Sequence, residues 1–305
     1  MANGRDNSLQ ERILKLKKER NAVILSHNYQ RGEVQDIADF VGDSLELSQK
    51  AAKTDADVIV FCGVHFMAET ASILCPDKTV LLPDAGAGCP MANMITAEQL
   101  RQKKKELPGA TVVTYINSTA GVKAESDYCC TSANGVKVVA QIDNEEILFV
   151  PDQYLGDFIA KRTGKEMTLW PGYCPTHVRI LPEDIIKRKK EHPQARVVVH
   201  PECRPDVIAL ADEALSTSGM IRYAGREDVK ELIVGTEVEI IHRLTKENPG
   251  KTFIPASQKA ICPNMKKITL DKVLHSLETM TPEVKVPEEI RVKARAAVDR
   301  MLAIV

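Results

Sequence analysis

Short apolar runs alternate with amphipathic stretches along almost the whole chain. The run at 57–62 is apolar after its first residue, which is typical of a strand buried on both faces of a parallel sheet. The stretch at 9–20 instead places leucines and an isoleucine on one side and lysines elsewhere, which predicts a helix. Strands regularly followed by helices predict an α/β protein with parallel sheets. Strands are expected over 22–29, 57–62, 79–83, 111–117, 146–151, 167–171, 196–202, 237–241 and 252–255, and helices over 9–20, 33–40, 45–53, 66–74, 97–106, 122–127, 182–192, 206–211, 270–279 and 287–303.

The same order of elements begins three times. The copies align without a gap, from the first strand to the second helix, on Asp39, Asp127 and Asp212, which lie 88 and 85 residues apart. Repeats of this length are complete α/β units and not turns of a solenoid. The three aspartates are interpreted as structural anchors. The predicted domains are 1–108, 109–194 and 195–280, with a C-terminal helix in 281–305 that packs on the first.

Polar side chains recur at matched positions of the three repeats. Two positions fall at the carboxyl ends of the first strands, where parallel α/β units bind ligands. A third falls at predicted helix starts, whose free N–H groups and positive dipole suit carboxylate or phosphate. Taken singly, such residues are ordinary strand ends and helix caps, but packing alone needs no matched triplets. The triplets are His27, Tyr115 and His200; Tyr29, Asn117 and Glu202; and Ser44, Ser132 and Thr217.

A Cys-Pro dipeptide also occurs once per repeat, at Cys89, Cys174 and Cys262. Three thiols on a common axis leave a [4Fe-4S] cluster one protein ligand short, which gives an iron with an open position. Zinc held by the three thiols and His177 is the rival interpretation. The symmetric contexts favour the cluster, since no histidine corresponds to His177 in the other repeats. Packing is expected for the remaining thiols, Cys62, Cys75, Cys129, Cys130 and Cys203.

Composition narrows the class of protein further. The net charge of −1 provides no basic footprint for nucleic acid or an anionic membrane. No apolar run is long enough to span a bilayer, and the first residues lack the apolar core of a signal peptide, so a cytoplasmic location is expected. The eight cysteines contain no Cys-x-x-Cys pair, so any metal site must be assembled from distant segments.

The motifs of the chain resemble those of the quinolinate synthase family. The resemblance covers roughly residues 22–280 and includes several long polar strings. These are Ser-His-Asn-Tyr at 26–29, Gly-Asp-Ser at 42–44, Cys-Pro-Met-Ala at 89–92, Tyr-Ile-Asn-Ser at 115–118, Cys-Thr-Ser-Ala-Asn at 130–134, Pro-Asp-Gln-Tyr-Leu-Gly at 151–156, Pro-Gly-Tyr-Cys-Pro-Thr-His at 171–177, His-Pro-Glu-Cys at 200–203, Ser-Thr-Ser-Gly-Met at 216–220 and Cys-Pro-Asn-Met at 262–265.

The resemblance implies three α/β/α domains, related by pseudo-threefold symmetry, around a central active site. It implies a transferase of NAD biosynthesis that condenses iminoaspartate with dihydroxyacetone phosphate to quinolinate, phosphate and water. The implied cofactor is a [4Fe-4S] cluster on Cys89, Cys174 and Cys262, with its fourth iron open to substrate. An L-aspartate oxidase or dehydrogenase is the expected functional partner, and neither nucleic acid nor a membrane is expected.

The reaction that the resemblance implies needs several proton transfers, and the hypothesis is that Glu202, Tyr29 and Tyr115 carry them as acids or bases. The resemblance also carries substrate-binding roles to matching positions. Substrate binding is expected at His27, Ser44, Tyr115, Ile116, Asn117, Ser132, His200, Pro201, Glu202 and Thr217. Two other functions are open on the residues alone: an aconitase-like iron–sulfur hydro-lyase and a non-enzymatic iron–sulfur sensor.

Overall fold

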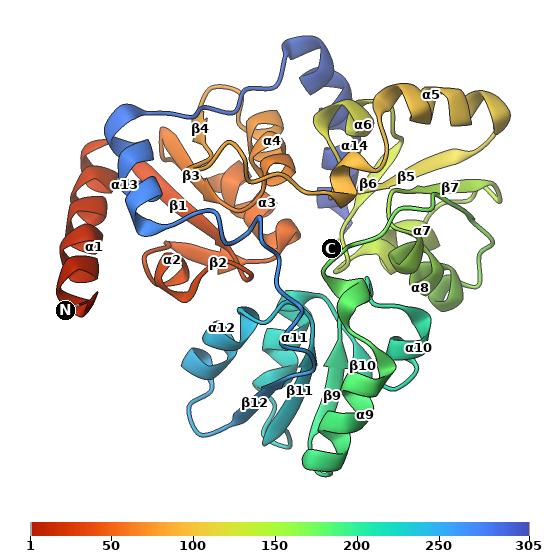
Figure 1. The fold of residues 1–305 in the computed structure, drawn as a ribbon. Coiled ribbons are helices and arrows are strands. Elements are labelled where there is room, and N and C mark those ends of the chain that lie inside the picture. The colour runs from red at the N-terminus through yellow and green to blue at the C-terminus, as the bar shows by residue number, and fades with distance from the viewer. Residues whose placement is uncertain (1, 305) are drawn as a thin grey trace.

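The computed structural model describes residues 2–304, with side chains from residue 8 onward. Within that range the chain forms three four-stranded sheets, each wholly parallel, as the sequence predicts (Figure 1). Their strand orders are β2-β1-β3-β4, β6-β5-β7-β8 and β10-β9-β11-β12, so the same topology occurs three times. The strands are β1 Ala22–His27, β2 Phe40–Gly42, β3 Val58–Cys62, β4 Thr79–Leu81, β5 Thr111–Tyr115, β6 Tyr128–Cys130, β7 Ile147–Val150, β8 Thr168–Leu169, β9 Arg196–Val199, β10 Glu213–Ala214, β11 Glu231–Gly235 and β12 Thr252–Pro255.

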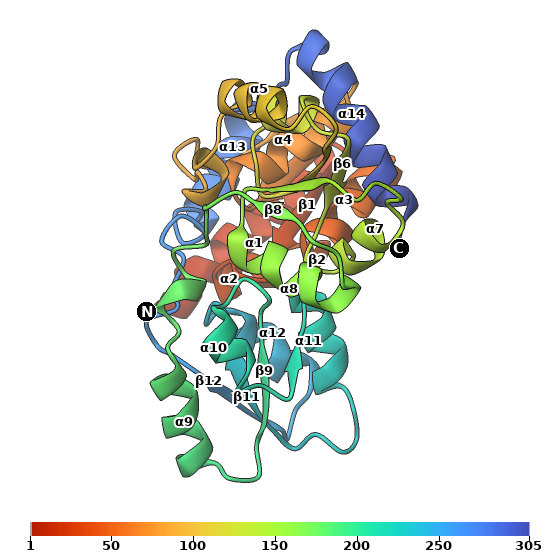
Figure 2. The same ribbon diagram turned by 90° about the vertical axis from the view of Figure 1, so that its right-hand side faces the viewer.

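Helices separate successive strands and cover the sheets. The central strands β3 and β7 are buried at every residue, as expected of parallel strands covered on both faces. In both views the third sheet lies below the other two (Figures 1 and 2). The helices are α1 Ala2–Glu19, α2 Gly32–Asp36, α3 Ser44–Lys53, α4 His65–Leu74, α5 Ala97–Glu106, α6 Ala120–Ala124, α7 Gly135–Ala140, α8 Gln153–Thr163, α9 Pro182–Glu191, α10 Pro205–Ile208, α11 Thr217–Ala224, α12 Ile240–Glu247, α13 Leu270–Thr279 and α14 Glu288–Ala303.

The three repeat aspartates are structural anchors, as predicted. Each carboxylate accepts a hydrogen bond from a backbone N–H in the first strand of its repeat, and each aspartate N–H donates to the carbonyl of that same residue. The partners of Asp39, Asp127 and Asp212 are Ile24, Val112 and Val197, at 2.8, 2.8 and 2.7 Å from the carboxylate oxygens. A charge-assisted bond of this kind fixes the register between the first strand and the edge strand that follows the aspartate.

The helix that closes each predicted repeat packs on the next sheet around the molecule. Leu100 of α5 is buried with Val112 and Leu148 of the second sheet, and Ile185 of α9 is buried with Val197 and other residues of the third. Helix α13 completes the circle by packing on α1 and β3 of the first unit (Figure 1). Each unit therefore packs one helix against its neighbour, and these contacts hold the three units together. The domain boundaries at 108, 194 and 280 stay predictions.

Helix α14 lies along the outside of the first two units (Figure 2). It contacts α4 of the first unit, and it also packs against α6 and β6 of the second. The amide of Asn134 holds its end, donating to the carbonyls of Met301 and Ile304 at 3.0 and 2.8 Å. No helix among residues 2–304 combines the length and the apolar composition that crossing a bilayer requires.

One predicted strand is wrong. The third strand of the last sheet is β11, and residues 237–241 comprise a turn at 237–239 and the first two residues of α12. The alternation of charged and apolar residues at 237–241 resembles a half-buried strand, but its apolar members continue with Leu244 along one face of α12. The strand that does form, β11, begins directly after the mostly charged segment 226–230.

Candidate functional site

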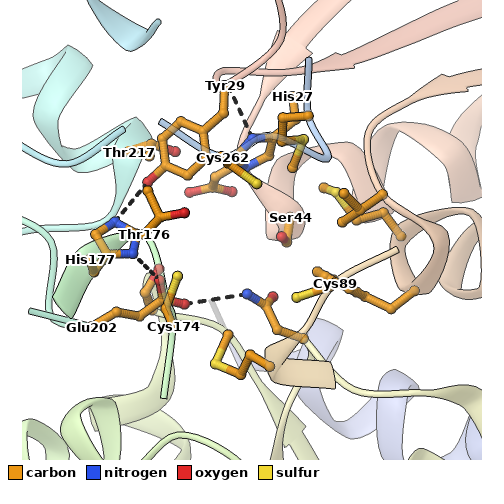
Figure 3. A pocket seen from close by; sticks show the side chains of 18 of the residues that line it. His27, Tyr29, Ser44, Cys89, Cys174, Thr176, His177, Glu202, Thr217 and Cys262 are labelled. Carbon is orange, nitrogen blue, oxygen red and sulfur yellow. Dashed lines mark hydrogen bonds and ion pairs between the residues drawn. The ribbon is translucent and has the colours of Figure 1, made fainter. Parts of the chain in front are cut away.

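The matched polar positions of the three repeats meet in one cavity. His27 and Tyr115 end strands β1 and β5, and His200 directly follows β9. The strand ends therefore deliver all three side chains to one cavity, and Figure 3 labels His27 among its lining residues. The cavity offers about 70 Å³ to the centres of water molecules, several times what one water needs. Its lining includes His27, Tyr29, Ser44, Cys89, Tyr115, Asn117, Ser132, Cys174, His200, Glu202, Thr217 and Cys262.

Two predicted binding residues lie behind that lining. Ile116 and Pro201 are buried, and neither is among the residues that border the cavity. Each sits between two residues that do border it, because successive side chains of an extended segment point in opposite directions. A contribution of these two positions to binding stays a prediction.

His27 and His200 have the same hydrogen-bonding pattern. The Nδ1 atom of each accepts from the backbone N–H two residues later, at 3.1 Å from Tyr29 and 3.3 Å from Glu202. Burial lowers the pKa of both histidines to about 3, against a smaller opposing effect of Glu202. A neutral imidazole whose Nδ1 accepts must carry its proton on Nε2. Both rings therefore present an N–H donor.

The hydroxyl residues of the third triplet differ in their local structure. Ser44 and Thr217 are the first residues of α3 and α11. The expectation that Ser132 also starts a helix is wrong, because it lies in the turn of residues 131–134 before α7. Its Oγ is 3.1 Å from Nε2 of His200. Since that nitrogen donates, the hydroxyl proton of Ser132 is free to bind another acceptor.

The three Cys-Pro thiols also face the cavity, one from each repeat (Figure 3). They are partly exposed, whereas Cys62, Cys75, Cys129, Cys130 and Cys203 are buried. Burial raises the pKa of Cys89 to about 12, and it also raises the pKa of Cys174 and Cys262. Thiolates in this cavity therefore need a positively charged partner, which a metal site supplies.

The spacing of the thiols distinguishes a cluster from a single ion. Among residues 2–304, one group of potential ligands has all its donor atoms within 4.8 Å of one another, and it consists of Cys174, His177 and Glu202. Two thiolates on one zinc ion are less than about 4.6 Å apart, given bonds of about 2.3 Å. The three thiols therefore do not all lie within that distance of one another, and they form no ready site for one ion, whereas a cluster takes each thiolate on a different iron. The donor set fits the cluster.

Glu202 lies at the centre of a charged and hydrogen-bonded group. Its Oε2 is 2.6 Å from Nδ1 of His177, and its Oε1 accepts from the amide of Asn117 at 3.3 Å. Burial alone would raise the pKa of Glu202, but His177, His200 and the Tyr115 hydroxyl together lower it to about 2. The carboxylate is therefore ionised at neutral pH. The side-chain oxygen of Asn117 is buried with no partner among residues 2–304, so it can accept a bond from a ligand.

A chain of hydrogen bonds leads from Glu202 to Tyr29. His177 Nε2 lies 2.8 Å from the Thr236 hydroxyl, which lies 2.5 Å from the Tyr29 hydroxyl. The same nitrogen also lies 3.4 Å from the Tyr29 hydroxyl directly (Figure 3). Burial, and next the charge of Glu202, raise the pKa of Tyr29, and the same two causes raise that of Tyr115. Both phenols are therefore proton donors at neutral pH.

Sequence reasoning missed the role of Thr236 and considered His177 only as a zinc ligand. Both ring nitrogens of His177 have close polar neighbours, with Nδ1 at 2.6 Å from Glu202 and Nε2 at 2.8 Å from the Thr236 hydroxyl. The position of His177, three residues after Cys174, was the one available signal. Thr236 follows β11, the strand that the sequence pattern did not reveal.

Comparison with known proteins gives one consistent result. A family model described as quinolinate synthetase A protein matches residues 11–303. Quinolinate synthase of Dehalococcoides mccartyi (strain CBDB1) is 64% identical over 297 residues, which cover 97% of this chain and 98% of the relative. The quinolinate synthase of Geobacter sp. (strain M21) is 59% identical, with the same coverage. Quinolinate synthase 2 of Methanosarcina acetivorans is 55% identical over 98% of this chain and 96% of the relative.

Proposed function

The chain belongs to the quinolinate synthetase A family, and we propose that it condenses iminoaspartate with dihydroxyacetone phosphate. The products are quinolinate, phosphate and water, and the reaction is a transferase step of NAD biosynthesis. The observation that carries this proposal is the cavity itself. Hydrogen-bond donors suited to anions and three thiols, contributed by three similar units, border one cavity.

The donors suit substrates that together carry two carboxylates and a phosphate. Ser44 and Thr217 offer hydroxyl groups at two helix starts, and His27 and His200 offer neutral N–H donors. Among the described residues that line the cavity, none is arginine or lysine. Anions are thus held by dipoles and hydrogen bonds, which favours release of the phosphate product over tight retention.

Cys89, Cys174 and Cys262 would hold the [4Fe-4S] cluster in this proposal. A cluster with three cysteine ligands leaves one iron without a protein ligand, and such an iron is a Lewis acid for a substrate oxygen or nitrogen. The chain's own part is to supply the thiols from three units. The substrate donors therefore surround the same point.

Proton transfer is assigned to Glu202, Tyr29 and Tyr115. Glu202 is ionised and can accept a proton from a carbon or nitrogen of the substrate. Tyr29 and Tyr115 retain their protons and can donate them to a leaving hydroxyl or to phosphate. His177 and Thr236 connect the base to Tyr29 through contacts of 2.6, 2.8 and 2.5 Å. A proton taken by Glu202 can therefore return through Tyr29 in a later step.

The supply of iminoaspartate is part of the proposal. An imine hydrolyses in water, so a short path from its source is advantageous. We place the protein in the cytoplasm beside an L-aspartate oxidase or dehydrogenase, either of which forms iminoaspartate.

The test is an anaerobic assay with dihydroxyacetone phosphate and iminoaspartate generated in situ. Quinolinate and phosphate are expected in equal amounts, with neither product formed when one substrate is omitted. An aconitase-like hydro-lyase would interconvert hydroxy acids and release no phosphate. An iron–sulfur sensor would form no product. Absence of quinolinate from protein with an intact cluster would refute the proposal.

A further inference from the structure

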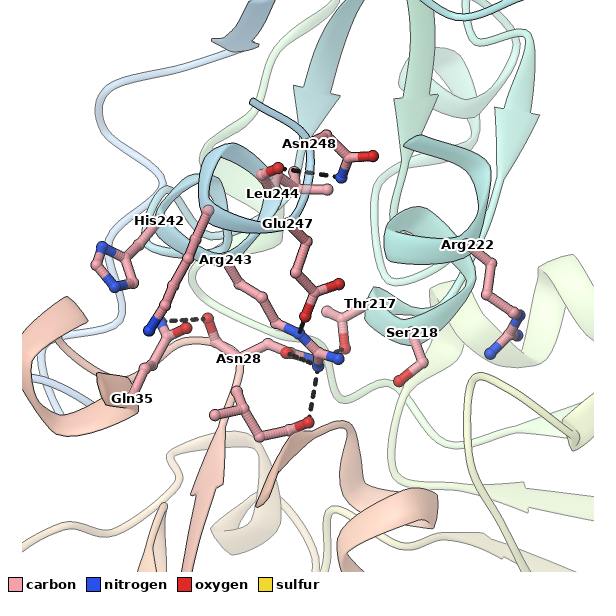
Figure 4. A network of polar contacts seen from close by, with 12 residues as sticks. Asn28, Gln35, Thr217, Ser218, Arg222, His242, Arg243, Leu244, Glu247 and Asn248 are labelled. Carbon is pink, nitrogen blue, oxygen red and sulfur yellow. Dashed lines mark hydrogen bonds and ion pairs between the residues drawn. The ribbon is translucent and has the colours of Figure 1, made fainter. Parts of the chain in front are cut away.

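Asn28 connects the candidate site to the third unit of the fold. It stands between His27 and Tyr29, but its fully buried side chain is not part of the cavity lining. The amide nitrogen Nδ2 donates to Oγ1 of Thr217 at 2.8 Å, and the amide oxygen Oδ1 accepts from Nη1 of Arg243 at 2.9 Å (Figure 4). Thr217 borders the cavity, and Arg243 belongs to α12.

The guanidinium group of Arg243 is itself fixed. Its Nη1 also donates to the carbonyl of Val41 at 2.7 Å, and its Nε donates to Oε1 of Glu247 at 2.6 Å (Figure 4). Val41 lies in β2, three residues before Ser44. Arg243 of the third unit therefore binds the first unit at two points. One is the side chain of Asn28, and the other is the backbone of β2, the strand that leads to Ser44.

The chemistry of these groups fixes which atom donates and which accepts in each hydrogen bond of this series. Arginine has donors and no acceptor, so the atom of Asn28 that faces Arg243 must be the amide oxygen. The amide nitrogen must then face Thr217, and the hydroxyl oxygen of Thr217 must accept. A hydroxyl has one proton, and this proton remains available for an acceptor on the other side, in the cavity. The same polarity holds at Ser132, whose oxygen accepts from His200.

We propose that Asn28 and Arg243 are positioning residues that fix the Thr217 hydroxyl as a hydrogen-bond donor to an anionic substrate group. This inference rests on the proposed function, because it takes Thr217 as a substrate-binding residue. Neither Asn28 nor Arg243 touches substrate. Arg243 selects the orientation of the amide, and the amide selects the orientation of the hydroxyl.

The decisive comparison is between Asn28→Asp and Asn28→Ala. Aspartate has the shape of asparagine and keeps a partner for Arg243, so a purely structural role predicts that it is the milder change. The proposed relay, which runs from Arg243 through Asn28 to Thr217, predicts the opposite, because a carboxylate cannot donate and instead accepts the Thr217 proton. We expect quinolinate to bind at least about tenfold more weakly to Asn28→Asp and about threefold more weakly to Asn28→Ala. The measurement is anaerobic calorimetric titration of the cluster-loaded protein, which needs no turnover.

A double-mutant cycle separates the relay from simple repulsion by the new charge. Thr217→Val removes the hydroxyl and keeps the shape. If Asn28→Asp acts through that hydroxyl, its effect on quinolinate affinity shrinks to less than about threefold in the Thr217→Val background. An undiminished effect in that background would show that the charge acts directly on the ligand, and the relay would be rejected.

Variants of Arg243 provide a test that does not depend on Asn28→Asp folding. Arg243→Lys keeps a donor and should preserve most of the affinity, whereas Arg243→Met frees the amide to turn over and should weaken binding several-fold. Arg226→Met is the matched control, since this exposed arginine pairs with Asp228 and lies outside the network. Equal affinities in Arg243→Met and wild type would overturn the role of Arg243.

The outcomes distinguish this inference from the function on which it rests. Wild-type protein that neither forms nor binds quinolinate refutes the proposed function, and the relay falls with it. Wild-type protein that does both, together with an Asn28→Asp variant of unchanged affinity, refutes the relay alone. Thermal unfolding and cluster absorbance of each variant show whether a loss of affinity reflects loss of the fold.

Discussion

Replacing Glu202 by glutamine is the sharpest single perturbation of the site. The substitution keeps the shape of the side chain and removes the charge that faces His177 at 2.6 Å. It also places an amide beside Asn117, whose own amide donates to this carboxylate at 3.3 Å. The thiols are untouched, so the cluster and the fold are expected to remain. What is lost is the base.

The size of the effect follows from the role. Positioned acid–base groups contribute roughly 10²- to 10⁴-fold to a rate. At about 1.4 kcal/mol per factor of ten, this corresponds to about 3–5 kcal/mol of barrier. Because Glu202 is ionised far below neutral pH, the base is fully available in the wild type, and the loss should appear undiminished at pH 7. We therefore expect kcat for quinolinate formation to fall by at least about 100-fold.

The assay compares quinolinate formation, cluster absorbance and thermal unfolding in Glu202→Gln and Glu227→Gln. Glu227 is an exposed glutamate of the same unit, and its substitution should leave all three unchanged. A Glu202→Gln enzyme with kcat within tenfold of wild type would refute the assignment of Glu202 as base. Loss of cluster absorbance would instead mean that Glu202 supports the metal site.

Further consequences concern the anchors, the proton path and the histidines. Asp127→Ala should lower the free energy of unfolding by about 1.5–3 kcal/mol, since it removes a charge-assisted bond to the backbone, while the KM values stay unchanged; chemical denaturation and steady-state kinetics check this. Thr236→Val removes the hydroxyl that bridges His177 and Tyr29, leaving only their longer direct contact of 3.4 Å, and should lower kcat by about tenfold without loss of quinolinate affinity. The folded-state pKa of His27 is lowered to about 3, so the unfolded chain binds more protons as pH falls below about 6.5. Stability should therefore fall from about pH 6.5 toward pH 3, and His27→Gln should reduce that slope in denaturation curves measured across this range.

The symmetric part of the molecule is readable from the sequence. A strand end, a helix start and a thiol that recur at one offset in three repeats must lie at equivalent places around one axis. This is why the sequence alone predicts that His27, Tyr115 and His200 lie together. The three aspartates could be separated from the site by the same logic, because they follow short helices and do not end strands.

The asymmetric part is not readable in that way. Thr236 binds Tyr29 across 207 residues, and Arg243 binds Asn28 across 215, with no counterpart in the other repeats. Such contacts exist because the first and third units pack against each other in one particular orientation. Local sequence pattern carries no information on that orientation. The strand wrongly predicted at 237–241 also lies between Thr236 and Arg243, the two residues that make these contacts with the first unit.

The central claim is that three units each contribute one thiol to a single cluster beside the substrate. Iron and acid-labile sulfide per chain, measured on anaerobically reconstituted protein, test it most directly. We expect about four irons and four sulfides in wild type and in Cys203→Ala, and a loss of both in Cys89→Ser, Cys174→Ser and Cys262→Ser. Full iron content in any one of those three serine variants, or one zinc ion per chain in place of iron, would contradict it.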